Sequence, residues 1–159
     1  MIGWDDDFCA LLAARGRYVI RFDNRDIGRS SRMEHLGRPG VMALQMMRAA
    51  GLPCTAPYAL EDMAHDALGL LDALGIARAH VVGVSMGGMI AQLLAIHDED
   101  RVASMTSIMS GTSEPGLPPP TAEAMMALLN PAPEERERYL QYYADVWRVL
   151  RGERFVRDA

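Results

Sequence analysis

The chain has 159 residues, of which 50% are apolar and 23% are charged, an ordinary composition for one globular domain. Its formal net charge of −5 argues against binding to nucleic acid or to an anionic membrane surface. All 16 basic residues are arginines, which excludes chemistry that needs a lysine, such as Schiff-base formation or the lysine of a P-loop.

The pattern of helices and strands alternates along most of the chain. We expect a helix from Trp4 to about residue 15, a strand at 17–22, an irregular segment at 32–58, a helix at 60–74, a strand at 79–84, a helix at 86–97, a strand at 102–109, and helices at 121–129 and 133–150. Strands that alternate with helices predict a parallel sheet with right-handed crossovers, so the fold class is α/β.

Two helix ends carry usual signals and one lacks them. Asp5, Asp6 and Asp7 fall in the first turn of the first helix, where the helix dipole favours negative charge, and we interpret them as a helix start and not as a metal site. Ala59 precedes the helix at 60–74, where a Ser, Thr or Asp would be a better cap. Gly75 is the expected stop of that helix.

Targeting signals and cysteine patterns are lacking. The first seven residues contain neither the basic region nor the apolar stretch of a secretory signal peptide. The apolar run at 81–96 contains polar residues and is shorter than a membrane span. Cys9 and Cys54 do not have the spacing of metal ligands. We therefore expect a cytoplasmic protein with two reduced thiols and no contact with a membrane.

The stretch Gly83-Val84-Ser85-Met86-Gly87-Gly88 joins an expected strand to an expected helix. It has the G-x-S-x-G pattern of a nucleophile elbow, in which a serine occupies a tight, strained turn. The glycines at 83, 87 and 88 let strand and helix approach closely. Ser85 is the candidate nucleophile, and the backbone N–H of Met86 is the candidate oxyanion donor. Two phosphate-binding loops are excluded. A dinucleotide-binding loop would have Gly at 85, where this chain has Ser, and a P-loop would end in Gly-Lys-Ser/Thr, whereas Gly88 is followed by Met89.

A serine nucleophile needs a histidine as its base, and the four histidines are poorly placed for that role. His80 begins the strand that leads to Ser85, His97 ends the following helix, His65 lies on the polar side of its helix, and His35 lies in the irregular segment. In proteins with this elbow the acid and the histidine follow the serine in sequence. We therefore expect the triad Asp and His, and the second oxyanion donor, to lie outside this chain.

Four segments carry further motifs: Gly3-Trp4-x-x-x-Phe8, Tyr18-Val19-Ile20-Arg21-Phe22-Asp23-Asn24-Arg25-Asp26-x-Gly28-Arg29-Ser30, Leu60-x-Asp62-Met63-Ala64-x-Asp66, and His80-Val81-Val82-Gly83-x-Ser85-Met86-Gly87-Gly88. Together they resemble the α/β-hydrolase superfamily, and in particular its aclacinomycin methylesterase-like branch, from Gly3 to about Ser110. The resemblance implies a partial α/β-hydrolase fold over residues 1–114 and the start of a helical cap over residues 115–159.

The resemblance also implies an esterase that acts on a small-molecule ester through an acyl-enzyme on Ser85, without a metal or an organic cofactor. It implies a structural role for the turn at 23–30, with a pocket wall as the alternative. Asp62 and Asp66 are expected to be structural as well, with an acid–base pair as the alternative. The family's first three strands have no counterpart here, so we expect a gap in the sheet between 18–22 and 79–84, in a fragment that lacks both ends.

Other activities use the same elbow. A C–C bond hydrolase, an acyltransferase and a cofactor-free haloperoxidase all fit Ser85, whereas dehalogenases and epoxide hydrolases have an Asp there. A non-catalytic hydrolase-like domain that binds a ligand or a partner is the third class, since such domains can keep the elbow.

Overall fold

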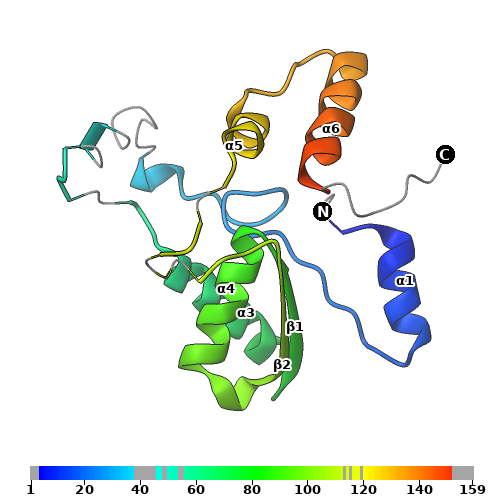
Figure 1. Ribbon diagram of the computed structural model, residues 1–159. Coiled ribbons are helices and arrows are strands. Elements are labelled where there is room, and N and C mark those ends of the chain that lie inside the picture. The colour runs from blue at the N-terminus through cyan, green and yellow to red at the C-terminus, as the bar shows by residue number, and fades with distance from the viewer. Residues whose placement is uncertain are drawn as a thin grey trace. The chain divides into compact units, whose positions relative to one another are not determined.

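The computed structural model describes residues 4–37, 46–47, 50–53, 56–112, 114, 116–118 and 120–151 (Figure 1). The chain forms two compact units, Met1–Thr112 and Ser113–Ala159. Within its described residues, the first unit contains the helices α1 (Asp6–Ala14), α3 (Leu60–Ala73) and α4 (Met86–His97). It also contains the strands β1 (Ala79–Val84) and β2 (Val102–Ile108) and the short 3-10 helices η1 (Glu34–Leu36) and η2 (Glu99–Arg101). The second contains the helices α5 (Ala122–Leu129) and α6 (Arg136–Leu150).

Helix α1 spans Asp6–Ala14, so it confirms the predicted helix but begins two residues after the predicted start at Trp4. The carboxylate of Asp5 caps it by accepting the N–H of Asp7 at 2.8 Å and the N–H of Phe8 at 3.2 Å. The remaining acidic residues of the first turn, Asp6 and Asp7, lie at the positive end of the helix dipole. The interpretation of this acidic run as a helix start is confirmed.

Helix α3 spans Leu60–Ala73 and is capped from inside its first turn. Ala59 has no side-chain acceptor, but the carboxylate of Asp62 reaches back and accepts the Ala59 N–H at 2.7 Å. This bond is half of a capping box, which explains how the helix begins without a polar cap residue. Gly75 follows the helix with φ 67°, the left-handed conformation expected of a stop.

Strands β1 (Ala79–Val84) and β2 (Val102–Ile108) form a parallel pair, with Val82 opposite Thr106 and Val84 opposite Ile108. Between them run helix α4 (Met86–His97) and the 3-10 helix η2 (Glu99–Arg101). Helix α4 packs on both strands, and α3 packs on α4 (Figure 1).

The core of the first unit lies between the two helices. It consists of Met63, Ala64 and Ala67 from α3 with Ile90 and Leu94 from α4. Val81 of β1 and Val102 of β2 are partly buried and pack against it. This arrangement fixes the start of α4 against the end of β1, where the G-x-S-x-G motif lies.

The strand expected at 17–22 is not formed, and that prediction is wrong. A strand exists only through ladder hydrogen bonds with a neighbour, and within the described ranges β1 and β2 pair only with each other. Within the described ranges no strand lies beside residues 17–22 to complete a ladder with them. In the irregular segment the structure describes one 3-10 helix, η1 (Glu34–Leu36), and much of that segment lies outside the described residues.

The second unit is a pair of helices, α5 (Ala122–Leu129) and α6 (Arg136–Leu150). Thr121 caps α5 by accepting the N–H of Ala124 at 3.2 Å. The hydroxyl of Tyr142 on α6 lies 2.7 Å from the carbonyl of Asn130 and 3.0 Å from that of Ala127, and so ties the two helices together. The role of this unit as the start of a cap stays a prediction.

Candidate active site

Ser85 lies on the turn between β1 and α4, with φ 54° and ψ −122°. Only glycine reaches this region of the backbone map without strain. Hydrogen bonds hold the residue there, because its N–H donates to the Ile108 carbonyl at 2.8 Å and its carbonyl accepts the Gly88 N–H at 2.8 Å. The sequence predicts a strained strand-to-helix turn at this position, and the backbone angles agree with it.

Two of the three motif glycines sit where a side chain has no room. A Cβ on Gly83 would lie 2.0 Å from the carbonyl oxygen of Gly87, and a Cβ on Gly88 would lie 2.1 Å from the Oγ of Ser110. A Cβ on Gly87 itself would meet no atom within 4 Å, so Gly87 contributes its backbone, and not a missing side chain, to the close approach.

Met86 is the first residue of α4. The first N–H groups of an α-helix have no acceptor inside the helix, and within the described part of the chain no backbone carbonyl outside the helix accepts that of Met86. This N–H adjoins Ser85 at the positive end of the helix. The pair therefore offers a hydroxyl and a neighbouring donor suited to an anionic oxygen.

Two serines that the sequence analysis did not identify, Ser107 and Ser110, lie next to Gly88 at this turn. The Oγ of Ser110 lies 2.6 Å from the Ser85 carbonyl oxygen and 3.0 Å from that of Ile108. The Oγ of Ser107 accepts a hydrogen bond from the Gln92 side chain at 3.1 Å. One signal was available: the carboxyl ends of adjacent parallel strands meet at one edge of a sheet, so polar residues after β2 fall beside the end of β1.

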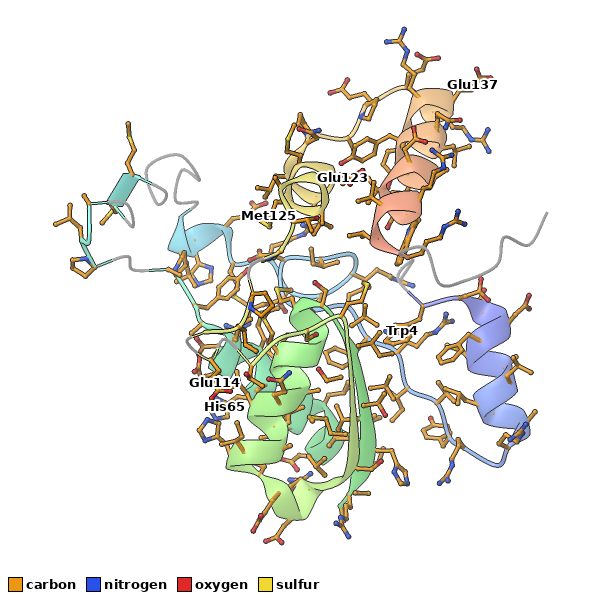
Figure 2. The ribbon with its side chains drawn as sticks, in the orientation of Figure 1. Trp4, His65, Glu114, Glu123, Met125 and Glu137 are labelled. Atoms are coloured by element: carbon orange, nitrogen blue, oxygen red, sulfur yellow. The ribbon has the colours of Figure 1, made fainter. Side chains whose placement is uncertain are left out.

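None of the four histidines, all of which are described, is hydrogen-bonded to the Ser85 hydroxyl. His80, at the beginning of β1, shares a hydrogen bond of 2.7 Å with Ser104 and accepts one of 3.3 Å from Arg17. His97 is the last residue of α4. His65 is exposed on α3 and directed away from the strands (Figure 2). His35 lies in the 3-10 helix η1. That the base lies outside this chain stays a prediction.

Arg25 connects the turn at 23–30, for which the resemblance implies a structural role, to helix α3. Its guanidinium donates two hydrogen bonds to the Asp66 carboxylate, at 2.7 and 2.8 Å, and one to the Asp62 carbonyl at 3.1 Å. The guanidinium also lies 5.1 Å from the ring centroid of Tyr58, whose hydroxyl donates to Asp26 at 2.8 Å. Hydrogen bonding to Asp66 raises the pKa of Arg25. Asp62 and Asp66 thus have structural partners, which favours the structural reading over an acid–base pair.

The described residues contain no group of three or more His, Cys, Asp or Glu side chains that could hold a metal ion. Cys9 is a free thiol, whereas Cys54 lies outside the described residues. Over the same residues no helix has both the length and the apolarity to cross a membrane.

Comparison with known proteins gives a match to the alpha/beta hydrolase fold over residues 4–153. The rhodomycin D methylesterases DauP of Streptomyces sp. (strain C5) and DnrP of Streptomyces peucetius are 36% and 35% identical over 94% and 98% of this chain, and over 51% and 53% of their own lengths. A putative carbamate hydrolase, RutD of Variovorax paradoxus (strain S110), is 32% identical over 80% of the chain and 40% of its own length. The chain thus spans about half the length, or less, of these curated relatives. With a match that covers nearly all of its residues, the chain belongs to the α/β-hydrolase family.

Proposed function

We propose that this chain carries the nucleophile of a serine carboxylic ester hydrolase and that Ser85 is that nucleophile. The observation that carries the proposal is the backbone of Ser85, held at φ 54° and ψ −122° between β1 and α4. A strained conformation of a non-glycine residue persists only where its surroundings fix it, and it is typical of active sites. The conformation belongs to the turn that presents the serine hydroxyl above the sheet in this family.

In the proposed reaction the Oγ of Ser85 attacks the ester carbonyl carbon while a base removes its proton. The carbonyl oxygen becomes an oxyanion that accepts the Met86 N–H, and its collapse expels the alcohol, which takes up the proton from the base. Water then cleaves the acyl-enzyme by the same steps and releases the acid. None of the four histidines is hydrogen-bonded to Ser85, and we propose that the base comes from outside the described residues.

The relatives support a substrate class. Two of them are named rhodomycin D methylesterases and match nearly the whole chain. We therefore propose a methyl ester of a small organic molecule as the substrate, with methanol as the leaving group. The proposed chemistry proceeds without a metal or an organic cofactor.

A carbamate is the second candidate substrate. The chain is 32% identical to a protein named a putative carbamate hydrolase over 127 residues. The carbonyl of a carbamate is open to the same attack by Ser85, with expulsion of an amine or an alcohol. The other activities that fit the same elbow, and a non-catalytic binding domain, have no comparable support.

The test uses the full gene product, by which we mean the polypeptide of the longest reading frame that contains these residues. A fluorophosphonate probe, which phosphonylates activated serines, should label it at the peptide that contains Ser85, and Ser85→Ala should abolish both labelling and the hydrolysis of methyl esters. Ser104→Ala, the loss of a hydroxyl near the far end of β2, is the matched control and should keep both. Turnover by Ser85→Ala at the wild-type rate would refute the assignment, and turnover of carbamates alone would favour the second substrate.

A further inference from the structure

The hydroxyl of Ser110 joins the segment after β2 to the peptide bond that follows Ser85. Its Oγ lies 2.6 Å from the Ser85 carbonyl oxygen and 3.0 Å from that of Ile108, and the hydroxyl has one proton to donate. The shorter distance assigns that proton mainly to Ser85. In return the N–H of Ser85 donates to the Ile108 carbonyl at 2.8 Å. The N–H of Ser85 is therefore bonded to the last residue of β2, and its carbonyl to the segment that follows β2.

The Ser85 carbonyl and the Met86 N–H belong to the same peptide group. In a planar trans peptide these two bonds point in opposite directions, so a donor that fixes the carbonyl also fixes the direction of the N–H. A hydrogen bond to the carbonyl also polarises the peptide and strengthens its N–H as a donor. We propose that Ser110 is a positioning residue that orients the Met86 N–H toward the oxyanion, an inference that rests on the proposed function.

The other donors to the Ser85 carbonyl do not perform the same task. The N–H groups of Gly88 and Met89 reach it at 2.8 and 3.2 Å, but both belong to α4 and move with the start of that helix. Ser110 is the one donor, among the described residues, that comes from a different element. It therefore fixes the peptide relative to the sheet and not only to its own helix.

The surroundings of Ser110 keep its hydroxyl in place. Met109 has φ 52°, a left-handed conformation that turns the chain sharply at the end of β2. The Ser110 Oγ occupies the space next to Gly88, where a Cβ would lie 2.1 Å from it. The absence of a side chain at position 88 thus leaves room for the donor.

The test compares Ser110→Ala with Ser110→Thr, which keeps the hydroxyl, in the full gene product. We expect Ser110→Ala to lower kcat for a methyl ester by about tenfold with KM within about twofold, since the contact acts on the charge that develops in the transition state. Inhibition by a phenylboronic acid, whose anionic adduct with serine occupies the oxyanion position, should weaken by about tenfold as well. Ser110→Thr and Ser104→Ala should both retain the wild-type kcat and the wild-type inhibition by the boronic acid.

A second readout does not depend on turnover. The amide ¹H and ¹⁵N resonances of Met86 should shift in Ser110→Ala and stay in place in Ser104→Ala, because only the first removes a donor from its peptide group. Where Ser110→Ala does not fold, the pair Ser110→Thr and Ser110→Val makes the same comparison at nearly equal volume.

The outcomes separate the two proposals. Wild-type kcat and boronate inhibition in Ser110→Ala, with Ser85→Ala inactive, would overturn the role of Ser110 and keep the proposed function. Full turnover by Ser85→Ala would overturn the proposed function, and unshifted Met86 resonances in Ser110→Ala would then overturn the positioning role as well. A loss of activity in Ser110→Ala that appears in KM alone would also contradict it.

Discussion

Arg25 forms a bidentate ion pair with Asp66, which lies 41 residues further along the chain, with N–O distances of 2.7 and 2.8 Å. A planar guanidinium and a carboxylate match each other in this geometry. The Arg25 side chain is 15% exposed and that of Asp66 is 42% exposed, so the pair is only partly screened by water. It connects the turn after residues 17–22 to α3, and α3 packs in turn on α4, which begins at Met86.

The first prediction concerns this ion pair. Arg25→Lys should lower the free energy of unfolding by about 1 kcal/mol, because an ammonium group cannot form the paired hydrogen bonds. Arg138→Lys is the matched control, since Arg138 pairs with Glu135 at 3.1 Å while the two side chains are 77% and 61% exposed. That change should cost less than about 0.5 kcal/mol. Urea unfolding of both variants makes the measurement, and equal losses would show that the Arg25 pair is no more than a surface contact.

The second prediction is a pH dependence at Tyr58. Its hydrogen bond to Asp26, followed by burial, raises the pKa of Tyr58 above its ordinary value. The neutral phenol therefore stabilises the folded state at every pH below the unfolded pKa of about 10, and this contribution is lost as the pH rises through the folded pKa. Urea midpoints measured from about pH 8 to above pH 10 should fall more steeply in the wild type than in Tyr58→Phe, which keeps the ring beside Arg25. Parallel curves would contradict the prediction.

The third prediction compares two glycines of the same motif. Gly83→Ala would place a Cβ 2.0 Å from the Gly87 carbonyl oxygen, so backbone atoms must move, and we expect a loss of about 2–4 kcal/mol in the free energy of unfolding. Gly87→Ala meets no atom within 4 Å. It should stabilise the protein by up to about 1 kcal/mol, because Ala is the better helix former. Thermal unfolding of both variants decides the matter, and a neutral Gly83→Ala would show that β1 and α4 can separate without cost.

The local sequence pattern predicted the helices, which close their own hydrogen bonds, and the two strands that pair with each other. Helix α4 has the predicted bounds of Met86–His97, and β1 has the predicted bounds of Ala79–Val84. Helix α6 begins at Arg136, three residues later than predicted, after a segment that contains Pro131 and Pro133. The strand at 17–22 failed because its ladder depends on a neighbour, which a pattern confined to one segment cannot supply.

The candidate site was predictable where it is contiguous in sequence. The motif around Ser85 identifies the turn, since its strain and close approach involve residues within a few positions of one another. The contribution of Ser110 depends on how β2 aligns with β1, with Val84 opposite Ile108, and on the left-handed conformation of Met109. Neither feature could be predicted from a local pattern. The alignment joins two separate segments, and Met109 is not a residue type that favours positive φ.

The last prediction separates stability from activity at Ser85. With φ 54° and ψ −122°, a residue that has a Cβ is strained, at a cost of about 1–3 kcal/mol, and glycine is not. Ser85→Gly should therefore raise the free energy of unfolding by about 1 kcal/mol relative to Ser85→Ala, after the greater chain entropy of glycine in the unfolded state is subtracted. Both variants lack the hydroxyl, so both should resist labelling by a fluorophosphonate.

The comparison of Ser85→Gly with Ser85→Ala removes the contribution of the hydroxyl and leaves only the free energy of the strained backbone. Urea unfolding of the three proteins gives the result, and a Gly variant less stable than the Ala variant would mean that the hydrogen bonds to Ile108 and Ser110 hold the turn without strain. A more stable Gly variant would mean that the protein gives up folding free energy to hold a serine at this turn, as expected where a side chain is kept for its chemistry.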